Sequence, residues 1–352
     1  MAFDSVLGHE RVRMLLAGAI RQRRLPPALL LAGPAGVGKK TLALAACRRL
    51  LCEGGADEPC EACAACRRAA RGVHPDLMVL APEGTAIKIE AVRELVRQVA
   101  GKPFEAAARA FVVDDAHLMT EQAANALLKS LEEPPPTSHV FLVSASPQGL
   151  LPTIRSRCQW LRFGPLPPAI LERHLVDHRG LAPEEARLRV AVAGGSLGAA
   201  LSFDAEGYRA LRDEMLGVLE ALERLEPFGR MEAAERLADL DDLPLGLTAL
   251  RALLRDVAVA RAGAGAALLN ADVADRVQAL AAGPLGPAAT PLAEAVGEVR
   301  SAVGGAPLAS TYERRNANKL LAMDLLMETF AGLRHVRRSS ADPSAEDRRG
   351  RR

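Results

Sequence analysis

Aromatic side chains are scarce in this chain, since phenylalanine, tyrosine and tryptophan make up 3% of its 352 residues. This scarcity leaves few platforms on which nucleic-acid bases could stack. A dominant charge is also missing, because 45 basic residues are offset by 43 acidic ones and the formal net charge is +2. The chain as a whole therefore has no electrostatic preference for nucleic acid or a membrane, and any DNA contact has to be local.

Long apolar runs are missing as well, and the start of the chain has neither the basic segment nor the apolar segment of a secretory leader. We therefore expect a cytoplasmic protein with no membrane partner.

The length allows two or three domains. Of six cysteines, four lie between Cys52 and Cys66. That clustering indicates a metal site in a reducing compartment rather than a disulfide framework.

Residues 29–41 have the pattern of a buried strand, a glycine-rich phosphate loop and a helix. The residues that would approach the phosphates are Gly33, Gly36, Gly38 and Lys39. The pattern G-x-x-x-x-G-K-[ST] places a magnesium-binding hydroxyl directly after the lysine, but here Lys40 stands there and Thr41 comes one residue late. The sequence therefore predicts a site for ATP or ADP that holds Mg²⁺ weakly or not at all. A plain glycine turn is the less favoured alternative.

Two carboxylates, Asp114 and Asp115, follow the apolar run 110–113. Ligands of a doubly wound sheet lie at such strand ends, so we expect Asp114 to hold the hydration shell of Mg²⁺. Asp115 stands where an ATPase of this design carries the glutamate that orients the attacking water. It is one methylene shorter, and a misplacement of about 1 Å can cost on the order of a hundredfold in rate. The alternative is a solvated acidic strand end.

The cysteines Cys52, Cys60, Cys63 and Cys66 form a compact group with two C-x2-C steps. Four thiolates can close a tetrahedral shell around Zn²⁺ with no open position, which predicts a structural zinc site. His74 could replace one ligand, although its His-Pro-Asp context suits a turn better. Cys47 is interpreted as a small buried hydrophobe, and four unligated cysteines remain the alternative.

Apolar runs at 28–32, 77–80, 110–113 and 140–143, with a further predicted strand at 160–163, alternate with segments of helical periodicity at 10–24, 87–100 and 120–133. This alternation predicts an α/β domain with a parallel sheet covered on both faces. Two or three short helices are expected, at 170–179, 183–193 and 196–203. From residue 208 to about 335 the pattern is helical throughout, with segments at 211–225, 230–240, 247–262, 271–282, 292–303 and 312–333.

With these elements in order, the chain resembles the clamp-loader branch of the AAA+ ATPases, whose bacterial members serve DNA polymerase III. The motifs that carry this resemblance are the phosphate loop, the four cysteines, residues 113–119, the run Leu-Leu-Lys-Ser-Leu-Glu-Glu-Pro-Pro at 127–135, and Ser156-Arg157-Cys158. The resemblance implies five parallel strands, a helical lid and a ring of five subunits. The neighbours would be motor (gamma/tau) and delta subunits, which load a sliding clamp onto primer-template DNA.

The resemblance also gives Arg157 a role, which is to point into the ATP site of a neighbouring motor subunit as a trans arginine finger. Judged by position alone, this arginine would be an ordinary surface charge. The resemblance further divides the chain into a nucleotide-binding-type domain at 1–164 with its zinc knuckle at 52–66, a lid at 165–205 and a helical collar at 206–336. The tail at 337–352 is polar and basic, and we expect it to be disordered.

Four hydrolytic positions depart from the pattern of an active motor. Lys40 replaces the hydroxyl, Asp115 replaces the glutamate, Ala145 stands at the approximate sensor-1 position between Ser144 and Ser146, and Gly198 stands where the lid of a motor carries arginine. We therefore expect a non-hydrolysing assembly subunit, which is neither a polymerase itself nor an active ATPase. The alternative is a working clamp-loader ATPase of the gamma/tau type.

Overall fold

The computed structural model describes residues 3, 6–54, 58–223 and 242–305. The predicted helices at 230–240 and 312–333 and the predicted disordered tail at 337–352 lie outside the described residues. The chain divides into two compact units. Unit 1 comprises residues 1–186 and 193–202, and unit 2 comprises residues 187–192 and 203–352. Among the described helices, none has both the length and the apolar character needed to span a membrane.

Unit 1 is built on a five-stranded sheet with the order β2-β3-β4-β1-β5, in which every neighbouring pair is parallel. The strands are β1 (Ala28–Ala32), β2 (Leu77–Leu80), β3 (Arg109–Val113), β4 (Ser138–Ser144) and β5 (Gln159–Arg162). All residues of β1 and β3 are buried. Such continuous apolar runs are expected where helices cover both faces of a parallel sheet, and the predicted α/β sheet is confirmed.

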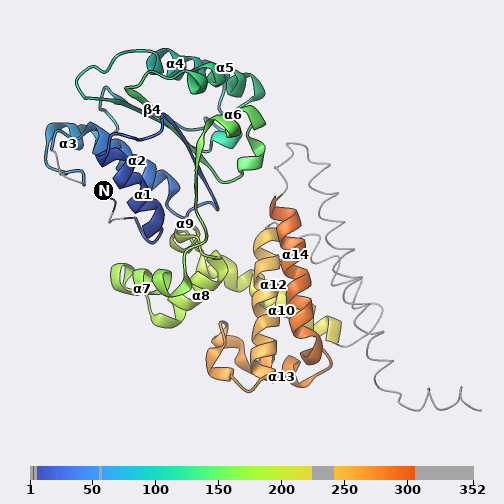
Figure 1. Ribbon diagram of the computed structural model, residues 1–352. Coiled ribbons are helices and arrows are strands. Elements are labelled where there is room, and N and C mark those ends of the chain that lie inside the picture. Colours follow the sequence, from blue (N-terminus) through green and yellow to red (C-terminus); the bar gives the residue numbers. More distant parts are fainter. Residues whose placement is uncertain (1–2, 4–5, 55–57, 224–241, 306–352) are drawn as a thin grey trace, which may run out of the picture. The chain divides into compact units, whose positions relative to one another are not determined.

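Alternate residues of β1 enter two different cores. Leu29 and Leu31 pack with the first set of helices, whereas Leu30 packs with the second set. The first set is α1 (Glu10–Arg21), α2 (Lys39–Leu51) and α3 (Ala64–Ala70), and the second is α4 (Ile89–Val99), α5 (Glu121–Glu132) and α6 (Pro152–Arg157). The sheet is therefore a middle layer between two helical layers (Figure 1).

Two short helices, α3 and α6, were absent from the sequence-based expectations. Helix α6 has only six residues, begins with a proline and buries only Ile154. It is too short for a 3.6-residue apolar repeat to appear, so periodicity could not reveal it. Helix α3 begins at the Cys63 cap and lies within the cysteine group.

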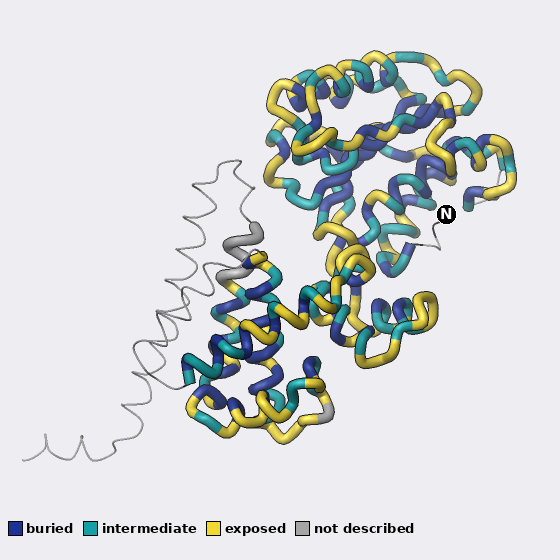
Figure 2. Tube along the Cα trace, turned by 180° about the vertical axis from the view of Figure 1, so that it is seen from behind, coloured by how far each residue is buried: buried dark blue, intermediate teal, exposed yellow. Residues whose placement is uncertain are grey.

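The helices in the range of the predicted lid are α7 (Pro168–Arg179), α8 (Pro183–Ala193) and α9 (Leu197–Leu201). Residues 187–192 of α8 are assigned to unit 2, and the rest of these helices to unit 1. The described part of unit 2 contains α10 (Ala205–Glu223), α12 (Leu243–Arg261), α13 (Ala274–Ala282) and α14 (Ala289–Gly305). One apolar core joins them. Their buried faces turn inward, while the opposite faces are exposed (Figure 2).

A fully buried carboxylate fixes the segment that follows α12. Asp256 accepts hydrogen bonds from the backbone N–H of Leu269 at 2.9 Å, and from the backbone and side-chain nitrogens of Asn270 at 2.9 and 2.8 Å. Asn270 in turn accepts a hydrogen bond from the Tyr208 hydroxyl on α10 at 3.3 Å. This network ties the loop to the helices of unit 2.

We predict that Asp256→Ala destabilises unit 2 by about 3 kcal/mol, because two buried N–H groups of Asn270 and the half-buried one of Leu269 lose their acceptor. Denaturant unfolding of the full chain, followed by circular dichroism, measures this loss. The matched control Asp275→Ala removes an exposed carboxylate in the first turn of α13 and should cost less than about 1 kcal/mol. Equal losses for the two variants would contradict this account of Asp256.

Candidate functional site

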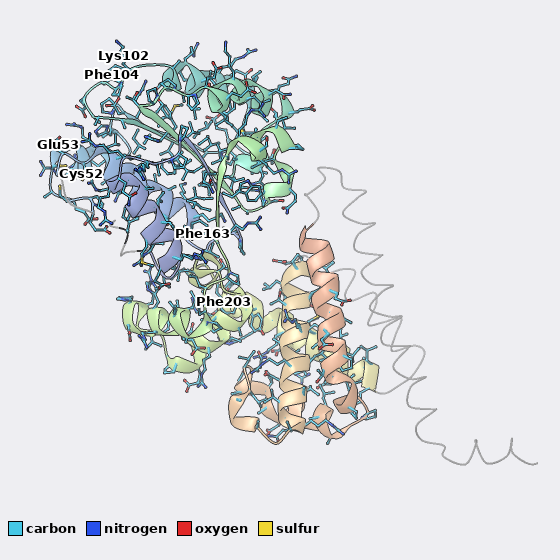
Figure 3. The ribbon with its side chains drawn as sticks, viewed as in Figure 1. Cys52, Glu53, Lys102, Phe104, Phe163 and Phe203 are labelled. Carbon is cyan, nitrogen blue, oxygen red and sulfur yellow. The ribbon has the colours of Figure 1, made fainter. Side chains whose placement is uncertain are left out.

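The phosphate loop leaves the carboxyl end of β1 with a backbone that only glycine fits. Gly33 has φ +154°, and a Cβ built there would lie 2.2 Å from the carbonyl oxygen of Phe163 (labelled in Figure 3). Gly36 has φ +71°, and its Cβ would lie 2.3 Å from Ser196 Oγ. The loop is therefore held closely between Phe163, which directly follows β5, and Ser196 of the lid segment.

Lys39, the first residue of α2, is folded against this loop. Its Nζ donates hydrogen bonds to the carbonyl oxygens of Gly33 at 2.7 Å and Pro34 at 2.5 Å, and the residue is 5% exposed. Burial lowers the pKa of Lys39, while the nearby charges of Asp115 and then Asp114 oppose that shift. An ammonium has three donors, so two loop carbonyls leave one for a phosphate oxygen.

Lys40 forms an ion pair with Asp114. Its Nζ lies 2.9 Å from Asp114 Oδ2, with side-chain exposures of 47% for the lysine and 17% for the aspartate. The two residues that the motif would assign to a hydrated magnesium ion thus contact each other directly. Thr41 is half-buried in the first turn of α2.

Asp115 has a left-handed backbone conformation, with φ 44° and ψ 47°, just before the short 3-10 turn Ala116–Leu118. Such a conformation costs a non-glycine residue roughly 1–3 kcal/mol, although aspartate tolerates it better than most residues. The turn places this carboxylate near Lys39, whose pKa it affects more than any other charge does. The two predicted carboxylates and the loop lysines are therefore brought together.

The lid segment rests on the phosphate loop within unit 1. The backbone N–H of Gly198 donates a hydrogen bond to the Gly36 carbonyl oxygen at 2.9 Å. A Cβ at Gly198 would lie 3.0 Å from the Gly36 Cα. A side chain as large as arginine at position 198 would require the loop or the lid to move.

His9 also contacts the loop, and sequence reasoning missed it. Its Nε2 lies 3.1 Å from the Val37 carbonyl oxygen, and its ring meets that of Phe163 edge-on at 4.8 Å. Burial lowers its pKa. His9 has φ 56° and lies immediately before α1. The pair Gly8-His9 directly before an amphipathic helix was the sequence signal that could have drawn attention to His9.

The region of the expected sensor-1 residue lies at the end of β4. Ser144 is the last residue of that strand and is fully buried, and its hydroxyl has no hydrogen-bond partner among the described residues. Ala145 and Ser146 follow and are half-buried. Since Ser144 pairs with Ala32 of β1, it borders the start of the phosphate loop.

Arg157 is the last residue of α6, and its guanidinium is accessible. Nη1 donates to the Thr153 carbonyl oxygen at 3.0 Å, and Nη2 lies 2.5 Å from Glu132 Oε1 on α5. The side chain is 34% exposed. One surface ion pair of this kind contributes about 0–1 kcal/mol, so the guanidinium can exchange its partner at little cost.

The helix that carries Arg157 is anchored on its other side. Cys158 and Ile154 are buried in the core shared with α4 and α5, and burial raises the pKa of Cys158 to about 12. The indole Nε1 of Trp160 donates to the Arg155 carbonyl oxygen at 2.9 Å. These contacts fix the short helix while leaving Arg157 at the surface.

Comparisons with known proteins agree with this architecture. The family described as "DNA polymerase III, delta subunit" matches residues 8–167. The delta-prime subunit of DNA polymerase III from Escherichia coli is 33% identical over 258 residues, which cover 72% of this chain and 76% of that protein. The chain belongs to the delta-prime family of DNA polymerase III subunits.

Two further relatives show how far the similarity extends. The delta-prime subunit from Bacillus subtilis is 39% identical over 178 residues, or 51% of this chain and 54% of that protein. The tau subunit from the same organism is 32% identical over 206 residues, or 57% of this chain and 36% of that protein. The match therefore spans about half the length of the first of these relatives and about a third of the second.

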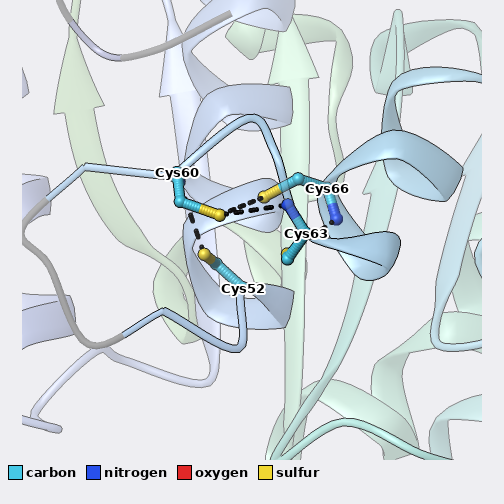
Figure 4. A group of neighbouring side chains, drawn as sticks. All are labelled: Cys52, Cys60, Cys63 and Cys66. Atoms are coloured by element: carbon cyan, nitrogen blue, oxygen red, sulfur yellow. Dashed lines mark hydrogen bonds between the residues drawn. The ribbon is translucent and has the colours of Figure 1, made fainter.

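Four clustered cysteines come together beside α3. The sulfur atoms of Cys52, Cys60, Cys63 and Cys66 all lie within 4.8 Å of one another (Figure 4). The sulfurs of Cys60 and Cys66 are 4.0 Å apart. A tetrahedral zinc ion with Zn–S bonds of about 2.3 Å needs sulfurs about 3.8 Å apart, so the four ligands fit Zn²⁺.

Backbone N–H groups point at these sulfurs, as thiolate ligands require. Cys63 donates to the Cys60 sulfur at 3.3 Å, and Cys66 donates to the Cys63 sulfur at 3.3 Å. The hydrogen bond from Cys63 is the largest of several that lower the pKa of Cys60 to about 6. Burial raises the pKa of Cys66 to about 12, so its thiolate needs a cation nearby.

His74 lies outside this group. Its Nδ1 accepts a hydrogen bond from the backbone N–H of Asp76 at 3.1 Å, and its Nε2 lies 3.1 Å from Glu105 Oε1. Cys47 is fully buried in α2, and burial raises the pKa of its thiol above the usual range. Both residues therefore have the structural environments that the sequence predicted.

We predict about one zinc ion per chain in protein purified without chelator. The double variant Cys60→Ser/Cys63→Ser should lose the metal and expose the knuckle to proteases, because that segment has few apolar side chains of its own. Elemental analysis and limited proteolysis measure these effects. Cys47→Ala is the matched control and should keep its zinc, and a double variant that also kept it would contradict the site.

Proposed function

We propose that this chain is a non-hydrolysing assembly subunit of a clamp loader, which supplies Arg157 to the ATP site of a neighbouring motor subunit. The observation that carries the proposal is a contrast within unit 1. Arg157 is held at the surface by an anchored helix, whereas the chain's own phosphate site pairs Lys40 with Asp114. The chain keeps the residue that would act on another subunit and alters those that would act at its own site.

The geometry of the phosphate site supports nucleotide binding without turnover. The loop glycines and Lys39 remain, so a nucleoside di- or triphosphate would find backbone N–H groups and an ammonium. Hydrolysis needs a positioned water and stabilised charge on the transferred phosphoryl group. Asp115 is shorter than the glutamate of an active motor, and an arginine at position 198 would require the loop or the lid to move.

Arginine is suited to the proposed role of Arg157. Its planar fork can donate two parallel hydrogen bonds to phosphate oxygens and stays charged at neutral pH. Glu132 holds the guanidinium in the isolated chain through a surface ion pair. The triphosphate of a neighbouring subunit would bind the same fork with more negative charge, so the arginine would transfer from the carboxylate to the phosphates.

The remaining assignments follow from this role. We place the zinc-binding cysteines in a structural site that stabilises residues 52–66. Unit 2 serves as the collar, with motor (gamma/tau) and delta subunits as neighbours in a ring of five. The complex then loads the sliding clamp onto primer-template DNA, and the near-neutral charge of this chain is consistent with DNA contacts made mainly by other subunits.

A working motor subunit of the gamma/tau type is the second candidate. The preserved glycines and Lys39 favour it, and so does the 32% identity to a tau subunit. The Lys40–Asp114 pair opposes it, because a motor uses that place for magnesium.

We predict that Arg157→Ala, in a complex reconstituted with motor and delta subunits, reduces turnover at the facing ATP site by about 10³-fold, the lower end for arginine fingers. The DNA-stimulated ATPase rate of the whole complex should fall by the fraction of that rate that this one site contributes. Arg157→Lys should recover little, because an ammonium lacks the fork.

The matched control is Arg93→Ala, which removes an exposed arginine from α4 and should leave the ATPase unchanged. Size-exclusion chromatography should show that all three variants enter the complex. If Arg157→Ala assembled and retained full stimulated ATPase, the finger role would be wrong.

A further inference from the structure

The two positions that a phosphate-loop protein uses to hold magnesium are joined to each other in this chain. They are the residue directly after the loop lysine and the aspartate that follows the buried strand β3. Here these residues are Lys40 and Asp114, and the ammonium lies 2.9 Å from the carboxylate oxygen. The ammonium therefore lies beside the carboxylate that would anchor a hydrated ion.

The chemistry of this pair does not fit Mg²⁺. Magnesium requires near-octahedral oxygen ligands at about 2.0–2.1 Å, and an ammonium offers three donors and no lone pair. A divalent cation next to Asp114 would also be repelled by Lys40. To admit the metal, the chain would have to break its own ion pair and move the lysine away.

The same residues do fit an anion. The first turn of α2 contains Lys39 and Lys40 and no acidic residue. Cations are unfavourable at a helix N-terminus, where the backbone already carries partial positive charge. Asp114 offsets one of these charges, and the Lys40 side chain remains 47% exposed. A polyphosphate with several negative charges would offset the rest.

We propose that Lys40 takes the place of magnesium, so that this loop binds nucleoside polyphosphates in their metal-free form. The inference rests on the nucleotide binding proposed above and adds the ionic form of the ligand. Lys39 donates to one phosphate group, as in any such loop. Lys40 keeps its contact with Asp114 and donates its remaining N–H groups to phosphate oxygens that would otherwise coordinate the metal.

The test is titration calorimetry of the full chain with ATP and with ADP, once with EDTA and once with excess Mg²⁺. For the wild-type chain we expect dissociation constants in EDTA that are no more than about threefold weaker than with Mg²⁺. Lys40→Thr restores the hydroxyl of the motif. In that variant we expect the dissociation constant in EDTA to be about tenfold weaker than that of the wild type. Excess Mg²⁺ should tighten binding by about the same factor.

Lys102→Thr is the matched control, since it removes an exposed lysine from the loop after α4 (labelled in Figure 3) and should bind as the wild type does. Thermal melts of all variants should show that each is folded. Wild-type binding at least about tenfold tighter with Mg²⁺ would overturn the inference, and so would Lys40→Thr binding that Mg²⁺ does not improve.

Absence of ATP and ADP binding under both conditions would overturn this inference together with the proposed nucleotide binding. The proposed assembly role is tested separately, by the Arg157 variants in the reconstituted complex.

Discussion

The contact between Lys40 and Asp114 is the constraint on which the functional interpretation of this chain depends. The surrounding architecture is that of a nucleotide-binding domain, with a glycine loop at the end of β1 and two carboxylates at the end of β3. An ATPase places a divalent cation between these elements to neutralise the charge that develops during phosphoryl transfer. An ammonium lies beside Asp114 in that region here, and this contact is the basis of our proposal that the domain keeps the fold of a motor without its metal chemistry.

Other parts of unit 1 are consistent with a fixed, non-cycling site. Gly198 donates a backbone hydrogen bond to Gly36 and approaches it closely, at a position where the family resemblance implies an arginine in a motor subunit. Arg157 is instead presented by a short helix anchored through Cys158 and Ile154. Rigid support on one side and an easily exchanged surface ion pair on the other are consistent with the role that we propose for Arg157 at a neighbouring subunit.

Much of the fold could be predicted from the sequence, because the apolar strands and amphipathic helices of unit 1 have clear periods. Helix α6 could not, because only one of its six residues is buried, and α3 could not, because its buried residues are two alanines and a cysteine of the cysteine group. Among site residues, the loop lysines and carboxylates follow from motif spacing. The contacts of His9 with Val37 and of Glu132 with Arg157 join residues 28 and 25 positions apart, and no local pattern contains that information.

The most direct test of the central claim is the steady-state ATPase of the purified full chain alone, with ATP and Mg²⁺. The account predicts turnover no higher than that of a Lys39→Ala variant, even at nucleotide concentrations that saturate binding. Robust hydrolysis that disappears with Lys39→Ala would contradict it, and would show that this chain is a motor subunit in its own right.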